Sequence, residues 1–140
     1  MVAMKWLAVR VFSVGQESGK LDEMLFQRRK IADQYINDLS DCNNISLPIK
    51  NNHIQNNWQS LPIKYHGKQS QKQVVQYLSD CGIATRRGIM NAHQEEPYTN
   101  TYWSLPVSED SRDMTILLPL YHEMTSSDLE NVTHCIRNLA

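Results

Sequence analysis

The amphipathic stripe between Leu21 and Ser40 constrains the fold of this chain more than any other feature of the sequence. Its apolar residues recur at helical spacing, while polar and charged residues such as Gln27 and Asp33 occupy the opposite side. The apolar positions are Leu21, Met24, Leu25, Ala32, Tyr35, Ile36 and Leu39. This pattern predicts a long helix from about Leu21 to Ser40 whose apolar side packs in a core or at an interface.

The composition excludes several classes of protein. With 140 residues, 41% hydrophobic and 21% charged, the chain is typical of one globular domain. The formal net charge of −1 argues against nucleic acid or a membrane surface as a partner. No run approaches the roughly 20 apolar residues of a membrane span. Cys42, Cys81 and Cys135 form no CxxC pair, which favours reduced thiols and a cytoplasmic location.

The rest of the chain alternates between short strands and helices. Pro62 hints at an edge strand or a bulge, and Thr125 to Asp128 resembles a capping box that starts the last helix. After the first helix we expect an extended piece at 45–49, a strand at 58–65, a helix from Ser70 to about Asp80, a strand at 83–88, an irregular segment at 89–105, a short helix at 107–115, a strand at 116–120 and a final helix. This order predicts an α+β fold, in which helices cover one face of a small mixed or antiparallel sheet.

The segment from Gly82 to Tyr98 carries the residues most suited to binding. Arg86 and Arg87 are adjacent, and the arginine fork suits carboxylate and phosphate groups. His93 can donate, accept or carry charge near neutral pH. Each residue also has a structural interpretation, as an exposed or ion-paired strand arginine and a locally bonded loop histidine. A metal role for His93 is disfavoured because no other ligand stands at suitable spacing.

Six ordered marks over about 120 residues resemble the C-terminal small domain of the DegT/DnrJ family of nucleotide-sugar aminotransferases. They are Lys20 to Leu25, Arg28 to Ala32 with Tyr35 and Leu39, Leu47-Pro48 with Trp58, Gly82 to Gly88 followed by His93 and Pro97-Tyr98, Leu105 to Glu109, and Leu117 to Leu120 with Met124-Thr125. The resemblance implies a small domain over residues 20–140, preceded by a divergent segment at 1–19.

The resemblance also implies a chemistry. The family's enzymes are fold-type I and use pyridoxal phosphate to aminate keto-sugars linked to a nucleotide, in amino-sugar or surface-polysaccharide synthesis. By position, Arg86 or Arg87 would bind the anion of the donor or of the sugar diphosphate. His93 would lie on the sugar or phosphate side of the pocket.

The chain departs from the family in lacking a counterpart of the cofactor-binding large domain and its Schiff-base lysine. We therefore expect no pyridoxal phosphate on this chain alone, no activity alone, and a dependence on a missing large domain or a homologous subunit, with self-association of the isolated chain. The alternative is a stand-alone degenerate domain that serves as a binding module. Residues 1–19 would then cover the apolar surface, which the first hypothesis leaves uncovered.

Overall fold

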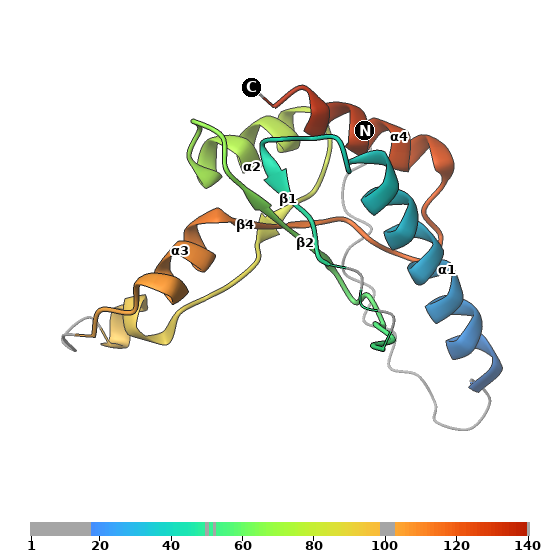
Figure 1. The fold of residues 1–140 in the computed structure, drawn as a ribbon, viewed down its shortest axis with the longest axis horizontal. Helices are drawn as coiled ribbons and strands as arrows, with labels where there is room; N and C mark the ends of the chain where they lie inside the picture. Colours follow the sequence, from blue (N-terminus) through green and yellow to red (C-terminus); the bar gives the residue numbers. More distant parts are fainter. Residues whose placement is uncertain (1–17, 50, 52, 99–102, 140) are drawn as a thin grey trace.

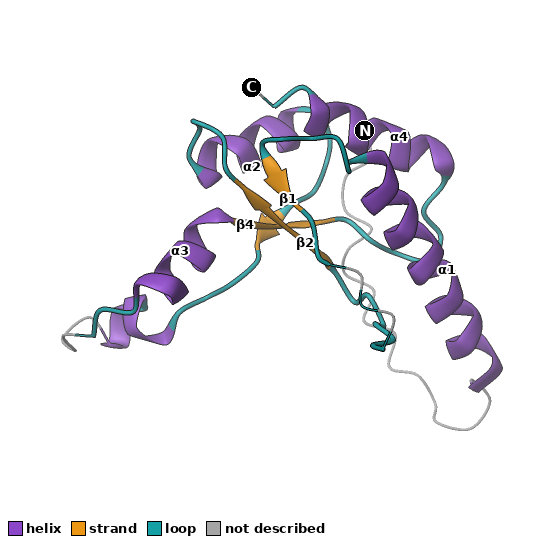
Figure 2. Cartoon of the chain, viewed as in Figure 1, coloured by secondary structure: helices purple, strands orange, loops and turns teal. Residues whose placement is uncertain are grey.

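The structure is a computed structural model that describes residues 18–49, 51, 53–98 and 103–139. The helices are α1 (Ser18–Asp38), α2 (Gln71–Asp80), α3 (Pro106–Met114) and α4 (Ser126–Arg137), with single 3₁₀ turns η1 (Ala92–Gln94) and η2 (Glu96–Tyr98). The strands are β1 (Ile45–Ser46), β2 (Leu61–Tyr65), β3 (Arg86–Arg87) and β4 (Thr115–Leu118). The expected α+β class is confirmed (Figure 2).

The four strands form one sheet in the order β1-β2-β4-β3, and every pairing is antiparallel. Residues directly opposite one another in such a ladder project to the same face. Ile63 lies opposite Ile116, and both are buried. Pro62 lies opposite Leu117, and both are only partly buried. One face of the sheet is therefore the core face, and the other is more open.

Three helices, α1, α2 and α4, supply the apolar side chains that cover the core face. Tyr35 of α1, Leu78 of α2 and Ile136 of α4 are fully buried in one cluster with the strand residues. The Tyr35 hydroxyl donates a hydrogen bond to the carbonyl of Pro119 at 3.0 Å, which ties α1 to the segment after β4. The predicted capping box at Thr125 and Asp128 is present and starts α4.

The molecule has the outline of an arch in Figure 1. Helices α2 and α4 lie along its top, α3 extends to one side, and the N-terminal half of α1 extends to the other. We call residues 89–98 with α3 the arm. The α1 leg is residues 18–29 with the described residues of 47–58, and a hydrogen bond from Arg29 Nε to the carbonyl of Asn56, at 2.9 Å, joins its two parts.

Two expected strands are shorter than the sequence pattern suggested. The strand expected at 58–65 begins at Leu61, because Trp58 has a φ of 47° and so leaves the extended region. The strand expected at 83–88 pairs only at Arg86 and Arg87. Pro62 is tolerated because β1 pairs only with Lys64 and Tyr65, which leaves the β1 side of β2 unpaired beside the proline.

The core predicts that alanine substitutions at two leucines change the free energy of unfolding by very different amounts. Leu61→Ala should lower the free energy of unfolding by about 2–5 kcal/mol, because the side chain is fully buried and its loss leaves a cavity. Leu21→Ala is the matched control: Leu21 is 54% exposed on the α1 leg, so the change should cost less than about 0.5 kcal/mol. Urea denaturation of the full chain measures both, and equal losses would contradict this core.

Candidate functional site

The turn after α2 sets the position of Arg86 and Arg87. Gly82 has a φ of 79°, and it follows the C-cap residue Cys81. The N–H of Ile83 bonds to the carbonyl of Leu78 at 2.8 Å, and the N–H of Gly82 bonds to that of Ser79 at 2.9 Å. This pair of bonds is a Schellman motif, and Ile83 and Leu78 are both buried beside it. The motif reverses the chain and directs it into β3.

The sheet register places the two arginines on opposite faces. Arg87 lies opposite Ile116 and so projects to the core face, whereas Arg86 lies opposite Leu117 and projects to the open face. Both side chains are exposed. The sequence left open which of the two binds an anion, and the register gives them different surroundings.

Gln71 at the start of α2 holds Arg87 in place. Its amide nitrogen donates to the carbonyls of Arg112 and Thr115, both at 2.7 Å, and its amide oxygen accepts from Arg87 Nε at 3.1 Å. These carbonyls stand at the C-terminal end of α3, where a positive charge is favoured. Arg87 of β3 is therefore linked to α2 through Gln71, which in turn bonds to the carbonyls at the end of α3.

His93 lies in the arm and is tied to Glu109 of α3. Its Nε2 is 3.0 Å from a carboxylate oxygen of Glu109, and only 9% of its side chain is exposed. The same oxygen accepts the backbone N–H of Leu105 at 2.9 Å, just before α3 begins. The bond from Leu105, followed by the bond from His93, holds the pKa of Glu109 below its ordinary value.

A second polar cluster fixes the arm, and sequence reasoning missed it. The side chain of Asn91 is buried, donating to Gln94 Oε1 at 2.9 Å and accepting from Ser108 Oγ at 3.1 Å. Gln94 Oε1 also accepts from Arg112 Nη1 at 3.1 Å. The partners lie up to 18 residues apart, so no local pattern reveals them.

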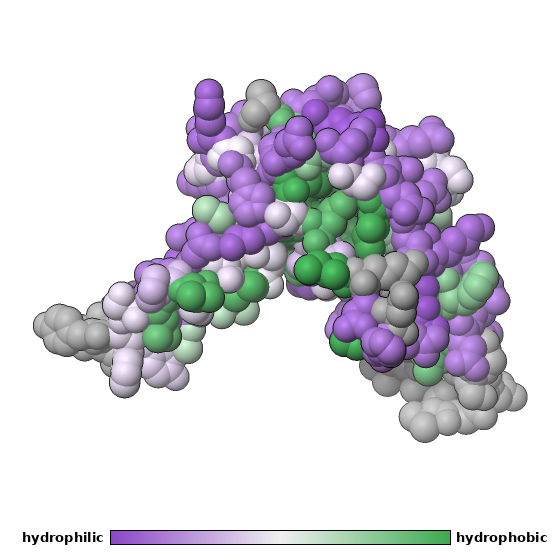
Figure 3. Space-filling view, viewed as in Figure 1, coloured by the Kyte–Doolittle hydropathy of each residue, from purple (hydrophilic) through white to green (hydrophobic). Residues whose placement is uncertain are grey.

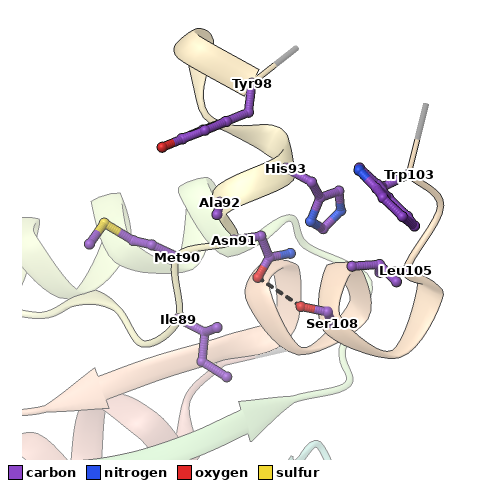
Figure 4. A pocket seen from close by; sticks show the side chains of 9 residues that line it. All are labelled: Ile89, Met90, Asn91, Ala92, His93, Tyr98, Trp103, Leu105 and Ser108. Atoms are coloured by element: carbon purple, nitrogen blue, oxygen red, sulfur yellow. Dashed lines mark hydrogen bonds between the residues drawn. The ribbon is translucent and has the colours of Figure 1, made fainter. Parts of the chain in front are cut away.

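His93 lies at a cavity of about 460 Å³ on the arm (Figure 4). Three polar residues line it, Asn91, His93 and Ser108, together with apolar and aromatic residues. The latter are Ile89, Met90, Ala92, Tyr98, Trp103 and Leu105. Neither Arg86 nor Arg87 lines this cavity, so the structure does not bring the three predicted site residues together.

Large apolar side chains are exposed only on the arm, on the α1 leg and in the segments adjoining them, within the described part of the chain. The arm side has Ile89, Met90, Tyr98, Trp103, Leu105 and Val107, and the α1 leg has Leu21, Phe26, Ile49 and Ile54. In Figure 3, apolar atoms gather on the inner side of the arch, and the surface above it is mainly hydrophilic. No exposed large apolar residue stands on α2 or α4. We call the inner side of the arch the saddle.

Comparison with known proteins decides the family. The model of the DegT/DnrJ/EryC1/StrS aminotransferase family matches residues 14–137. The chain belongs to this family. A curated relative, the dTDP-4-dehydro-2,3,6-trideoxy-D-glucose 4-aminotransferase of Saccharopolyspora spinosa, is 27% identical over 147 residues. That match covers 91% of this chain but 37% of the relative, so the chain spans little more than a third of the relative's length.

Solved structures of other aminotransferases share the fold. The aminotransferase TlmJ from Streptoalloteichus hindustanus aligns with a TM-score of 0.77 and 24% identity, covering 85% of this chain and 32% of TlmJ. The sugar aminotransferase CalS13 from Micromonospora echinospora aligns with a TM-score of 0.75 and 19% identity, covering 85% and 31%. Among the described residues, this family member has no helix long and apolar enough to cross a membrane.

Pyridoxal phosphate, the cofactor of this aminotransferase family, does not fit the cavity on the arm. The cofactor needs a lysine amine for its aldehyde and an acidic partner for its ring nitrogen. The cavity on the arm is lined by neither a lysine nor a carboxylate. Lys64 is engaged with Asp110 of α3 at 2.6 Å, on the open face of the sheet. The cavity on the arm therefore lacks the donors that this cofactor requires.

The lowered pKa of Glu109 predicts an acid-sensitive arm. A carboxylate with a depressed pKa stabilises the fold above its ordinary pKa of 4.5, and that contribution is lost as the pH falls through the folded value. Amide-exchange protection of residues 89–98 and α3 should therefore fall several-fold in acid, below about pH 4.5. Glu109→Gln should lower it already at neutral pH, because the charge that favours both bonds is gone.

Glu123→Gln is the control for the Glu109 experiment. Glu123 is largely exposed, and its carboxylate has a long contact of 3.9 Å with the side chain of His122. This variant should keep the protection of the arm unchanged. Equal protection in wild type and Glu109→Gln across the whole pH range would show that Glu109 does not hold the arm.

Proposed function

We propose that this chain is the C-terminal small domain of a pyridoxal-phosphate-dependent aminotransferase that acts on nucleotide-linked keto-sugars. The observation that carries the proposal is the family match over residues 14–137 in a chain that spans 37% of a sugar-aminotransferase relative. In this proposal the cofactor, the lysine and most of the sugar-binding groups come from a large domain, and the small domain is inactive without it.

The saddle supports a partner of this kind. Ordinary monomers expose apolar residues singly, whereas contiguous exposed apolar surface marks an interaction site. Here the exposed large apolar residues occupy the two sides of the arch, and the outer helices have none. We infer that the saddle straddles the large domain. A stand-alone binding module would instead need a cover, and of the residues 1–19 proposed for it, residues 1–17 lie outside the described residues.

Within this proposal the site residues take different roles. Arg86 projects to the open face, next to Leu117, and its side chain is exposed, so its guanidinium can bind an anion. Arg87 donates a hydrogen bond to Gln71, so in this proposal it stabilises the fold and does not bind the substrate. His93 lines the arm cavity and is oriented by Glu109, which suits it to contact the sugar or phosphate side of a nucleotide sugar.

The uncovered saddle predicts self-association of the isolated chain. Sedimentation velocity should show oligomers that increase with concentration. The double variant Met90→Gln and Val107→Gln should weaken them, since both side chains are 81% exposed. The control Lys72→Gln and Glu130→Gln, on the exposed surfaces of α2 and α4, should leave them unchanged. A wild-type chain that stays monomeric would favour a covered, stand-alone domain.

A chimera tests the proposed function directly. Residues 14–137 would replace the matching segment of the Saccharopolyspora spinosa relative. We expect the chimera to bind pyridoxal phosphate and to transfer an amino group to a nucleotide keto-sugar. The isolated chain, reduced with borohydride in the presence of the cofactor, should show no adduct at a specific lysine. A chimera that folds and binds the cofactor but transfers no amino group would contradict the proposal, as would a specific adduct on the isolated chain.

The same chimera separates the two arginines. Arg86→Gln should raise the KM for the nucleotide sugar roughly tenfold or more, the loss expected for a charge-assisted hydrogen bond, without lowering thermal stability. Arg87→Gln should mainly lower the Tm, because it removes a partner of Gln71. Arg86→Lys keeps the charge but loses the fork, so it should fall between wild type and Arg86→Gln. Equal KM values for the two glutamine variants would refute this assignment.

A further inference from the structure

The arm is joined to the rest of the domain at two neighbouring points of the chain. The chain enters the arm after Gly88 and leaves it at Met114, immediately before β4, and Figure 1 shows both connections at the inner end of the arm. None of the arm's described residues belongs to the main core cluster. Its one buried residue within the described part is Asn91, which is polar. The arm is therefore not held to the sheet by apolar packing in the core.

Side-chain hydrogen bonds join the two parts of the arm, residues 89–98 and α3, into one unit. Three bonds from one turn of α3 reach residues 91–94, at distances of 3.0–3.1 Å. Their members on α3 are Ser108, Glu109 and Arg112. The two parts cannot separate unless all three bonds break, so we expect the arm to keep its internal structure when it moves.

Two polar contacts link the arm to the sheet and to α2. Lys64 of β2 pairs with Asp110 of α3 at 2.6 Å, but both side chains are partly exposed, and such surface pairs stabilise little. Gln71 of α2 donates to the carbonyls of Arg112 and Thr115, both at 2.7 Å and partly buried. Loss of the Gln71 amide would leave these carbonyls without that donor, which is costly for buried groups. Gln71 is therefore the stronger restraint on the arm.

The two connections to the arm lie against each other at Gly88 and Thr115. The N–H of Gly88 bonds to the carbonyl of Thr115 at 3.0 Å. A side-chain carbon at position 88 would lie 2.5 Å from Thr115 Cγ2, so only glycine allows this close approach. Two connections held this close define a single axis, and hinges of this kind lie at the ends of secondary-structure elements.

One atom of the arm has an unmet demand in the observed position. Arg112 Nε is buried and has no hydrogen-bond partner among the described residues. A buried donor without a partner costs free energy. A second position of the arm that exposes this nitrogen to water would remove that cost.

We propose that Gly88 and Thr115 form a hinge about which the arm moves as one rigid body, and that Gln71 restrains this motion. The motion carries His93 and its cavity relative to Arg86, which stays on the sheet. It therefore changes the distance between two candidate site residues without unfolding either of them. The hinge is independent of the proposed function, and only its use, to bring His93 and Arg86 to one ligand, rests on that function.

The test measures residual dipolar couplings of the backbone amides in the weakly aligned full chain, without cofactor or substrate. Met90→Gln and Val107→Gln are present throughout to limit self-association. Hinge motions occur in microseconds to milliseconds, and these couplings average over them. We expect the amides of the arm to fit one alignment tensor, and those of α2, α4 and the sheet to fit another. The tensor of the arm should be smaller, because the motion averages its couplings.

Three further variants identify the restraint. Gln71→Ala should reduce the alignment of the arm further and leave that of the sheet unchanged. Asp110→Asn, which removes the exposed ion pair with Lys64, should have a smaller effect. Gln76→Ala is the matched control, because Gln76 is an exposed residue of the same helix and bonds only within it, to Asp80 at 2.8 Å. It should change neither tensor.

Two results would overturn the proposal. The first is a single tensor that fits the arm and the sheet equally well in Gln71→Ala, which would show a fixed arm. The second is a set of arm couplings that fits no single tensor while the sheet remains ordered, which would show local unfolding in place of a hinge.

Discussion

The pairing of β2 with β4 is the interaction on which the rest of this structure depends. Its register puts Ile63 beside Ile116 on the core face, and it puts Pro62 beside Leu117 on the open face. The helices α1, α2 and α4 can bury their apolar sides only because the first face is continuous. The short edge strand β3 adds to β4 in the same register, so the ladder also decides the direction of each arginine. A slip of one residue would exchange the surroundings of Arg86 and Arg87.

The sequence predicted the parts of the fold that local patterns control. The helical stripe located the buried residues Ala32, Tyr35 and Leu39, and the capping box located the start of α4. The same stripe also predicted packing for Leu21, which is exposed because the N-terminal half of α1 extends beyond the core. Periodicity shows which side of a helix is apolar, but it does not show how far the neighbouring layer reaches.

The candidate site depends on contacts that no local pattern contains. The sequence singled out Arg86, Arg87 and His93 as side chains with suitable chemistry, and it left open which arginine is free to bind. Their surroundings come from Gln71, 16 positions before Arg87, and from Glu109, 16 positions after His93. Both partners belong to helices whose positions depend on the whole sheet. Residue type can therefore identify a side chain as a candidate for binding. Whether that side chain binds a ligand or stabilises the fold depends on its tertiary contacts.

The glycine at position 82 shows how narrow a requirement of the backbone can be. A side-chain carbon added there would meet no atom within 4 Å, so the position has room for a larger residue. The φ of 79° nevertheless excludes most L-amino acids, since the left-handed region is costly for any residue with a Cβ. This turn therefore restricts the sign of the backbone φ angle and not the size of the side chain. A D-alanine, whose mirror-image preference matches that φ, would fit where L-alanine would strain the chain.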